Sequence, residues 1–314
     1  MSMDGYVQGR KAVNRTVVAQ APAKVNLHLE ILRQRHDGYH EIETVFQAVA
    51  LFDEVRVTLA DQYPGGEPDI LVTVEPKKAA PADETNLCWQ AARHFCREMK
   101  LSGRILIHLE KKIPSAAGLG GGSSDAAAVL LACNRLFKTG LDLGELEKLA
   151  APLGADVPFF IRGATAMGRG TGTQLTPLPA IRTGQFLIVK PGMELRTSEV
   201  YSHLKMGLTV NSAKANIQVM KSILARFPQK TWPGFNRLEE VVLPQQPALQ
   251  RLVLELRELA PVAMMSGSGS AVVAVFPERQ DLEEIVGEFR KAGLFVSVVG
   301  PHAAGPVIRD DHGI

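Results

Sequence analysis

Short runs of β-branched and apolar residues recur through the first 75 positions of the chain, at lengths typical of β-strands. Turn-forming residues separate these runs, notably in the segments 36–38 and 63–69. The pattern predicts strands throughout this part, and strict apolar alternation predicts another one after position 103. The expected strands are Thr16–Gln20, Asn26–Leu32, Glu41–Ala50, Glu54–Leu59, Ile70–Glu75 and Arg104–Lys111.

Helical spacing of apolar residues appears later in the chain. Side chains spaced by four predict a helix from Asn86 to about Lys100. After position 179 short strands and helices alternate, including a helix at Pro247–Leu259, a strand at Ala271–Phe276 and a helix at Asp281–Lys291. The final stretch, 300–314, is rich in glycine and proline, and we expect it to be a loose tail.

The length and composition indicate a two-domain globular protein. The chain has 314 residues, and domains average roughly 150 residues. We expect an α+β protein with domains at 1–175 and 176–314, joined near the Thr-Pro and Leu-Pro pairs at 176–179. Hydrophobic residues make up 46% and charged residues 22%, which excludes disorder of the whole chain. A net charge of +2 disfavours a dedicated nucleic-acid binder but leaves room for a local basic groove that holds a phosphorylated small molecule.

The cysteines and the apolar runs bear on the compartment. Cys88, Cys96 and Cys133 include no C-x-x-C pair, which argues against a disulfide framework and a cysteine zinc site. The longest apolar run, Ala126–Cys133, is far shorter than the ~18 residues that span a bilayer. The N-terminus lacks the apolar core of a secretory signal and only weakly resembles a transit peptide. We therefore expect a cytoplasmic protein, a monomer or homodimer, that binds neither membrane nor nucleic acid.

The segment 113–137 leads from a strand through a glycine-rich loop into an Ala- and Leu-rich helix. Consecutive glycines let several backbone N–H groups turn toward one point, and such a loop before a helix binds anions. Ser123 and Ser124 fall at the helix start, where a hydroxyl caps the helix or contacts phosphate or a metal. The alternative is a tight connection whose glycines serve packing only. Neither G-x-x-x-x-G-K-[ST] nor G-x-G-x-x-G occurs in the segment.

Three segments resemble motifs of the GHMP kinases, the superfamily named for galactokinase, homoserine kinase, mevalonate kinase and phosphomevalonate kinase. They are A-P-A-K-V-N-L (21–27), P-S-A-A-G-L-G-G-G-S-S (114–124) and M-S-G-S-G-S-A-V-V-A-V-F (265–276). The resemblance implies a ribosomal-protein-S5-like N-terminal domain, a ferredoxin-like C-terminal domain and an active cleft between them. It also implies ATP as phosphoryl donor and Mg²⁺ to bridge the ATP phosphates.

Three more matches, R-H-D-G-Y-H (35–40), L-G-A-D-V-P-F-F (153–160) and N-R-L-E (236–239), resemble one branch of this superfamily. That branch implies phosphorylation of the 2-hydroxyl of a cytidine diphosphate derivative of methylerythritol, in non-mevalonate isoprenoid biosynthesis. The alternatives are a homoserine or mevalonate type of GHMP kinase, an S5-like nucleic-acid-binding module and a Rossmann oxidoreductase. The balanced charge disfavours the module, and the missing dinucleotide fingerprint disfavours the oxidoreductase.

The resemblance assigns catalysis to Asp156 and Lys24. Phosphoryl transfer to an alcohol requires an oriented hydroxyl and neutralisation of the charge on the phosphates. We expect Asp156 to orient the hydroxyl and accept its proton late, while Lys24 holds Asp156 and stabilises charge. The alternatives are a helix N-cap for Asp156 and a solvated position for Lys24.

Four residues are expected to bind the acceptor substrate. Tyr39 and His40 resemble the family's cytosine contacts, since tyrosine offers a stacking face and histidine offers ring nitrogens. Asn26 and Thr197 are candidate polar contacts to the same substrate. A metal pair of His36 and His40 is disfavoured because the sequence offers no further ligands nearby.

The ATP-binding residues implied by the resemblance are the glycine-rich loop and three neighbours. Ser124 is also a possible contact to Mg²⁺, and no other metal ligand is assigned. His28 stands where the family more often has a bulky apolar residue, which would alter the floor of the substrate site. The expected ATP contacts are Pro114, Ser115, Ala116, Ala117, Gly118, Leu119, Gly120, Gly121, Gly122, Ser123, Ser124, Asn86, Leu87 and Lys111.

Overall fold

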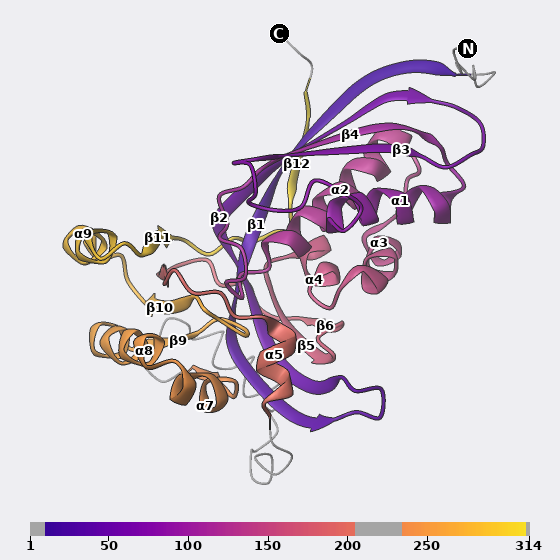
Figure 1. The fold of residues 1–314 in the computed structure, drawn as a ribbon. Helices are drawn as coiled ribbons and strands as arrows, with labels where there is room; N and C mark the ends of the chain where they lie inside the picture. Colours follow the sequence, from indigo (N-terminus) through magenta and orange to yellow (C-terminus); the bar gives the residue numbers. More distant parts are fainter. Residues whose placement is uncertain (1–9, 205–233, 312–314) are drawn as a thin grey trace.

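Two β-sheets, each with helices packed on one face, organise the part of the chain that the structure describes (Figure 1). The computed structural model describes residues 10–204 and 234–311. The first nine residues, part of the segment in which no secretory signal was expected, lie outside the described residues. The strands are β1 (Lys11–Gln34), β2 (His40–Gln62), β3 (Asp69–Glu75), β4 (Gly103–Glu110), β5 (Thr165–Gly170), β6 (Gln174–Pro177), β7 (Gln185–Lys190), β8 (Phe235–Asn236), β9 (Val262–Met265), β10 (Val272–Phe276), β11 (Phe295–Val299) and β12 (Val307–Asp311). The helices are α1 (Leu87–Met99), α2 (Gly121–Phe137), α3 (Leu143–Ala150), α4 (Val157–Arg162), α5 (Thr197–Ser202), α7 (Glu239–Val242), α8 (Pro247–Leu259) and α9 (Glu283–Lys291), with 3₁₀ turns at Ala151–Leu153 and Leu243–Gln245.

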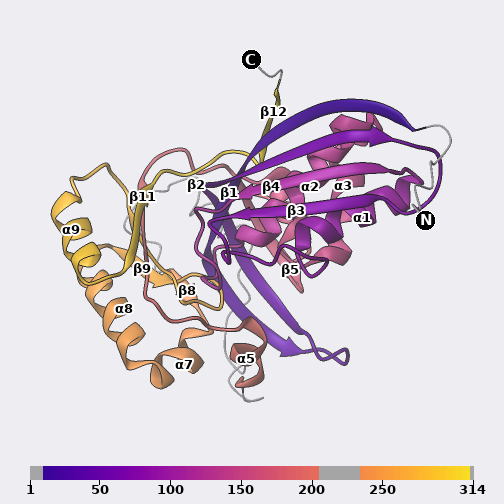
Figure 2. The ribbon, with the colours of Figure 1, turned by 45° about the horizontal axis from the view of Figure 1, so that its top comes forward.

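Strands β1 and β2 form a long antiparallel hairpin that runs through the whole molecule (Figure 1, Figure 2). The strands predicted at 16–20 and 26–32 are two parts of β1, and those predicted at 41–50 and 54–59 are two parts of β2. Bulges interrupt the alternation without ending the strands. One bulge falls at Pro22, whose missing N–H is tolerated where the ladder is already broken. The sequence pattern therefore predicted separate strands where the structure has bulges within the two long strands of one hairpin.

The first sheet has the order β12-β1-β2-β4-β3, with β5 and β6 extending from β2 and β8 beside β1. Helix α1 connects the parallel neighbours β3 and β4, and α1 and α2 cover one face of the sheet (Figure 2). The predicted helix is confirmed: Asn86 caps the start of α1, and Lys100 ends it in the left-handed conformation. Large side chains such as Phe46, Phe95 and Phe159 fill the core between helices and sheet.

The second sheet has the order β11-β7-β10-β9 with antiparallel neighbours throughout. Together with α8 and α9 the chain follows a β-α-β-β-α-β course, and the strand order is 4-1-3-2 when the strands are counted along the chain. This arrangement is ferredoxin-like, and the expected α+β fold of two units is confirmed. The expected helix at Pro247–Leu259 is α8, and the strand expected at Ala271–Phe276 is β10.

The expectation of a loose C-terminal tail is wrong. Strand β12 returns to the first sheet and pairs antiparallel with β1 from Thr16 to Gln20. Arg135 on α2 donates to Asp310, and Arg56 on β2 pairs with Asp311. The predicted second domain, 176–314, therefore begins within β6 and ends with β12, and both of these strands belong to the first sheet. The tail is ordered by a sheet edge that exists only in the folded protein.

The docking of this C-terminal segment can be tested at Gly163. Gly163 has φ +67°, and a Cβ there would lie 2.0 Å from the carbonyl oxygen of Ala304. Gly140 has a similar φ of +72° but nothing within 4 Å of its Cβ position, so Gly140→Ala introduces only backbone strain of about 1–2 kcal/mol. We expect Gly163→Ala to lower the free energy of unfolding by more than Gly140→Ala does. Urea denaturation of both variants measures this, and equal losses would contradict the docked segment.

Candidate active site

A cavity of about 1110 Å³ lies where the two sheets meet. It brings together segments that are distant in the sequence and that carry most of the predicted site residues. We call residues 114–124 the glycine loop and residues 265–271 the serine-glycine turn. The cavity is lined by inner positions of β1, the β1–β2 turn, the segment 79–87, the glycine loop, residues 155–156, α5 and residues 267–268 of the serine-glycine turn.

The glycine loop presents backbone N–H groups to this cavity. Helix α2 begins at Gly121, and Ser124 donates the first helical N–H bond, to the Gly120 carbonyl at 2.9 Å. The N–H groups of residues 121–123 therefore have no partner within the helix, and together with the helix dipole they favour an anion. Gly120 has φ +71°, and a Cβ there would lie 2.9 Å from the Phe160 ring and 3.1 Å from Lys24 Cγ. Both the conformation and the crowding require glycine at this position.

The serine-glycine turn packs directly on the glycine loop. The Ser266 hydroxyl donates to the Gly118 carbonyl at 3.0 Å, and the Ala271 N–H donates to the Ala117 carbonyl at 3.1 Å. A Cβ at Gly118 would lie 1.9 Å from the Ser266 carbonyl oxygen. Packing thus requires glycine at 118, and because Gly118 also lines the cavity, its predicted contact with ATP stays a prediction.

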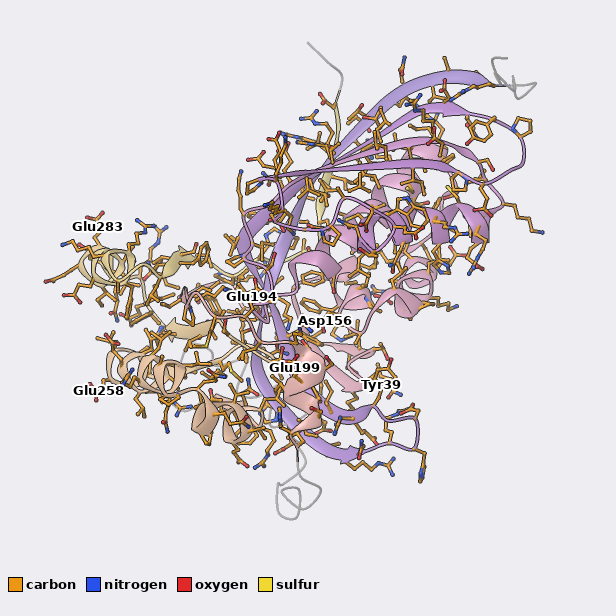
Figure 3. The ribbon with its side chains drawn as sticks, viewed as in Figure 1. Tyr39, Asp156, Glu194, Glu199, Glu258 and Glu283 are labelled. Atoms are coloured by element: carbon orange, nitrogen blue, oxygen red, sulfur yellow. The ribbon has the colours of Figure 1, made fainter. Side chains whose placement is uncertain are left out.

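Lys24 and Asp156 face each other in the cavity, with 3.4 Å between Nζ and Oδ2. Figure 3 shows the position of Asp156. Lys24 is 4% exposed, so it is not the solvated lysine considered as an alternative. Asp156 occupies the N-cap position of α4, but its side chain makes no capping hydrogen bond. The carboxylate is 30% exposed and remains available to a ligand.

Asn26 fixes the Lys24 ammonium. Its Oδ1 accepts from Lys24 Nζ at 2.6 Å, and its Nδ2 donates to the Thr44 hydroxyl at 2.7 Å. The Thr44 hydroxyl in turn donates to the His28 carbonyl. Asn26 was predicted to contact substrate, and it lines the cavity. Its amide oxygen, however, is engaged by Lys24, and its amide nitrogen by Thr44.

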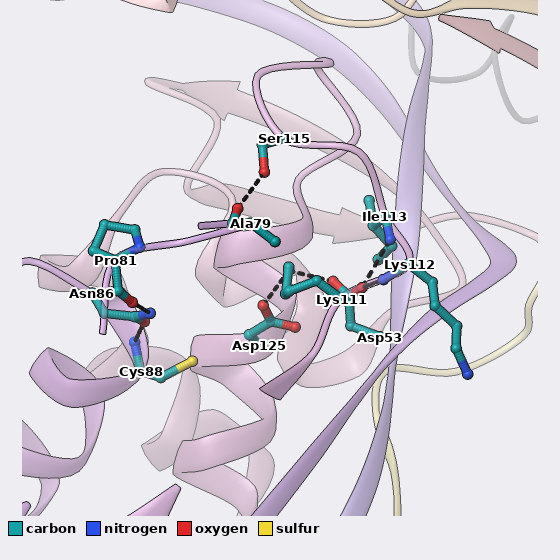
Figure 4. A network of polar contacts seen from close by, with 10 residues as sticks. All are labelled: Asp53, Ala79, Pro81, Asn86, Cys88, Lys111, Lys112, Ile113, Ser115 and Asp125. Atoms are coloured by element: carbon teal, nitrogen blue, oxygen red, sulfur yellow. Dashed lines mark hydrogen bonds and ion pairs between the residues drawn. The ribbon is translucent and has the colours of Figure 1, made fainter. Parts of the chain in front are cut away.

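A buried ion cluster anchors the start of the glycine loop (Figure 4). The Lys111 ammonium pairs with the carboxylates of Asp53 and Asp125. Asp53 also accepts the backbone N–H groups of Lys112 at 2.6 Å and Ile113 at 2.8 Å. Burial raises the pKa of Asp125 to about 7, although Lys111 opposes the rise. Lys111 was predicted to bind ATP; it lines the cavity, but its ammonium is engaged by these carboxylates.

Two other predicted ATP residues have structural roles. Asn86 accepts the Cys88 N–H at 2.8 Å as the cap of α1 and donates to the Pro81 carbonyl at 2.6 Å. Ser124 is fully buried and is not among the residues that line the cavity. A direct contact between the Ser124 hydroxyl and Mg²⁺ is therefore not supported, although the hydroxyl has no hydrogen-bond partner among the described residues. The described residues contain no group of three or more His, Cys, Asp or Glu side chains that could hold a metal ion.

Aromatic side chains gather at the other end of the cavity. Tyr39, in the β1–β2 turn, is 66% exposed and lies beside the cavity (Figure 3). The ring of His40 lies 5.2 Å from the ring of Tyr201 on α5. Burial, with a smaller effect of the Asp156 charge, raises the pKa of Tyr201. The Thr197 hydroxyl lies 2.9 Å from the Ser268 hydroxyl, which links α5 to the serine-glycine turn.

Sequence reasoning missed Tyr201, Asp53 and Asp125. Tyr201 belongs to a helix of six residues, too short for a periodic pattern. Asp53 falls between the strands predicted at 41–50 and 54–59, and its partners come from other segments, so no local pattern marked it. His28 does not line the cavity; burial lowers its pKa, and its ring packs 5.6 Å from Phe235.

Comparison with known proteins defines the class. The GHMP kinases N terminal domain matches residues 86–164, and the GHMP kinases C terminal region matches residues 220–293. The structure of homoserine kinase from Cytophaga hutchinsonii superposes with a TM-score of 0.71, covering 95% of this chain and 99% of that one. At 17% identity this likeness shows the fold alone. The fold and the glycine loop are those of a GHMP small-molecule kinase.

More similar relatives specify the branch. The 4-diphosphocytidyl-2-C-methyl-D-erythritol kinase of Lachnoclostridium phytofermentans is 36% identical over 86% of this chain and 91% of its own length. That of Geobacter sulfurreducens is 36% identical over 91% of this chain and 99% of its own. A crystal structure of 4-(cytidine 5'-diphospho)-2C-methyl-D-erythritol kinase matches with a TM-score of 0.74 and 33% identity, covering 90% and 99% of the two chains. The chain belongs to the 4-diphosphocytidyl-2-C-methyl-D-erythritol kinase family, and as a kinase it uses ATP. In the described residues no helix is long and apolar enough to cross a membrane.

The pair of Lys24 and Asp156 yields a first kinetic prediction. Asp156→Asn keeps the size of the side chain and removes its charge, so we expect kcat for phosphoryl transfer from ATP to fall about 100-fold. Lys24→Met should have a similar effect, since the carboxylate then loses its cation. Steady-state kinetics and circular dichroism check both variants. Glu199→Gln, at an exposed carboxylate of α5 (Figure 3), is the control and should retain wild-type activity. Activity of Asp156→Asn within threefold of wild type would contradict the assignment.

Proposed function

We propose that the protein transfers the γ-phosphoryl group of ATP to the 2-hydroxyl of 4-diphosphocytidyl-2-C-methyl-D-erythritol, giving the 2-phosphate and ADP. The observation that carries this proposal is the position of the Lys24–Asp156 pair. It lies in one cavity with the N–H groups of the glycine loop and with the aromatic side chains of the β1–β2 turn and α5. The names of the relatives supply the chemistry of the acceptor.

The donor is held chiefly by backbone groups. The N–H groups of residues 121–123 bind phosphate oxygens, and the segment 79–87 faces the nucleoside. Of the described carboxylates that line the cavity, Asp125 is bound to Lys111, and Asp156 faces Lys24. Mg²⁺ would therefore enter with ATP rather than occupy a carboxylate site formed in advance, which suits its reluctance to lose hydration. When bound, it neutralises charge between the β- and γ-phosphates.

Asp156 and Lys24 act on the acceptor side of the transfer. The Asp156 carboxylate accepts a hydrogen bond from the 2-hydroxyl and orients its oxygen toward the γ-phosphorus. In a loose transition state the proton leaves late, so a weakly basic carboxylate suffices. Lys24 is held by Asn26 and stabilises the Asp156 carboxylate before transfer. During transfer it stabilises the negative charge of the phosphoryl group that approaches the acceptor oxygen. The positions of both groups are fixed before substrate binds, which removes an entropic cost from the reaction.

The aromatic end of the cavity suits the cytosine of the acceptor. Tyr39 supplies an exposed face for stacking, and His40 is backed by Tyr201. Burial lowers the pKa of His40, so the ring is neutral near pH 7 and has one donor and one acceptor nitrogen. Thr197 offers a hydroxyl to the rest of the substrate.

We infer the compartment of the protein from the state of its cysteines. Cys88, Cys96 and Cys133 are free and buried, and burial raises the pKa of Cys96 to about 12. Free, unreactive thiols suit a reducing environment, and we assign the enzyme to the cytoplasm.

The acceptor can be identified with a substrate panel. Purified protein with Mg-ATP should form ADP with 4-diphosphocytidyl-2-C-methyl-D-erythritol, and mass spectrometry should detect the 2-phosphate. Homoserine and mevalonate should support less than about a hundredth of this kcat/KM, since neither reaches the aromatic end of the cavity. If ADP formed with homoserine or mevalonate but not with the cytidyl substrate, the proposed acceptor would be wrong. Omission of Mg²⁺ in the presence of EDTA should abolish turnover.

The recognition of cytosine gives a further prediction. Cytosine offers an N4 donor and an N3 acceptor, whereas uracil reverses both, so a buried polar partner discriminates between them. His40→Ala should lose both rate and base preference. Tyr39→Phe should keep both because the stacking ring remains, whereas Tyr39→Ala should cost about 1–3 kcal/mol. The measurement is kcat/KM for the cytidine and uridine forms of the substrate. Full discrimination by His40→Ala would show that the base is recognised elsewhere.

A further inference from the structure

The motif N-R-L-E at 236–239 has no role in the site as described so far. None of its four residues lines the cavity. The motif nevertheless lies between β1 and the serine-glycine turn, and Asn236 and Leu238 are buried. Its side chains reach both neighbours. They therefore connect the strand that carries Lys24 with the turn that closes over the glycine loop.

Asn236 binds the serine-glycine turn through both hydrogens of its amide. Its Nδ2 donates to the Met265 carbonyl at 2.7 Å and to the Gly267 carbonyl at 2.8 Å. Its Oδ1 accepts the Leu238 N–H at 3.0 Å. Reversal of the amide would place acceptor against acceptor on the turn, so these contacts fix its orientation.

Glu239 and Arg237 complete the connection. Glu239 accepts the Met265 N–H at 2.7 Å and the Arg257 guanidinium at 2.6 Å. Arg237 makes a two-point contact with Glu30 of β1, at 2.8 and 2.9 Å. One short segment thus holds both the beginning of the serine-glycine turn and the strand of Lys24.

The serine-glycine turn touches the catalytic pair. Gly267 has φ +54°, and a Cβ there would lie 3.2 Å from Asn26 Oδ1 and 3.3 Å from Lys24 Nζ. The Asn26 N–H points to the Ser266 hydroxyl at 3.4 Å. Asn236 binds the carbonyl of Gly267 and so fixes the backbone of the residue that lies against Asn26 and Lys24. A shift of the turn would disturb the Lys24 ammonium directly, and it would reach α5 through the contact between Thr197 and Ser268.

We propose that Asn236 and Glu239 are positioning residues, which hold the serine-glycine turn so that Lys24 stays directed at Asp156. This inference rests on the proposed kinase function, because it assigns the two residues an effect on the catalytic step. A positioning role distinguishes Asn236 and Glu239 from the residues that are proposed to contact substrate. It also accounts for the contacts of two polar side chains outside the cavity, both of which bind the backbone of the serine-glycine turn.

The test is a double-mutant cycle with Lys24. Asn236→Asp replaces the amide by an acceptor of the same shape and should lower kcat tenfold or more, with KM for the cytidyl substrate changed less than threefold. In the Lys24→Met background the same substitution should lower kcat less than twofold further, since it acts through Lys24. Wild-type turnover of the cytidyl substrate is measured first, so a wrong substrate is recognised before the cycle is interpreted.

A second pair of variants gives an answer even if Asn236→Asp does not fold. Glu239→Ala loses the acceptor for the Met265 N–H and should lower kcat, whereas Glu239→Gln keeps an acceptor oxygen and should restore most of it. Glu258→Ala, at an exposed glutamate of α8 (Figure 3), is the matched control and should resemble wild type. Either of two results overturns the proposal. One is a folded Asn236→Asp or Glu239→Ala with wild-type kcat, and the other is a full additional loss in the Lys24→Met background.

Discussion

The close approach of two backbone segments is the constraint on which the site depends. At Gly118 the glycine loop lies so near the serine-glycine turn that a single Cβ would stand 1.9 Å from the Ser266 carbonyl oxygen. Backbone contact at this distance brings the two segments together without intervening side chains, and hydrogen bonds from Ser266 and Ala271 hold it in register. The cavity exists because the two sheets meet here, and the N–H groups of α2 are thereby directed into it.

Both buried lysines near this junction are compensated by acceptor groups. Lys24 is bound by Asn26 and Asp156, and Lys111 by Asp53 and Asp125. An unpaired ammonium at such depth would cost several kcal/mol, and pairing with good geometry offsets that cost. The two lysines have different consequences. Asp156, the partner of Lys24, is open to the cavity and can meet a substrate hydroxyl. Asp53 and Asp125, the partners of Lys111, are buried and fix the loop.

The arrangement places the groups proposed for phosphoryl transfer on neighbouring elements. The N–H groups at the start of α2 favour an anion, β1 supplies Lys24, and the N-terminal position of α4 supplies Asp156. The β1–β2 hairpin, seen in Figure 1, carries Lys24 in β1 and Tyr39 in its turn, so a single pair of strands sets the distance between these two residues. Positions on strands and helices vary less than positions on free loops, which suits a reaction whose rate depends on alignment.

The sequence by itself determined the fold class, the family and most of the segments that meet in the cavity, because glycine patterns and apolar periodicity are local properties of the chain. It also indicated Lys24 and Asp156, whose catalytic roles stay predictions. Only the tertiary structure decided which polar groups are free to bind ligands: Lys111 lies at the cavity but is engaged by Asp53 and Asp125, and Ser124 is buried and does not line the cavity. The same holds for β12, which lacks a strand-like context in the sequence but pairs with the edge of β1. Burial and hydrogen-bond partners depend on residues far apart in the chain, and no local pattern encodes them.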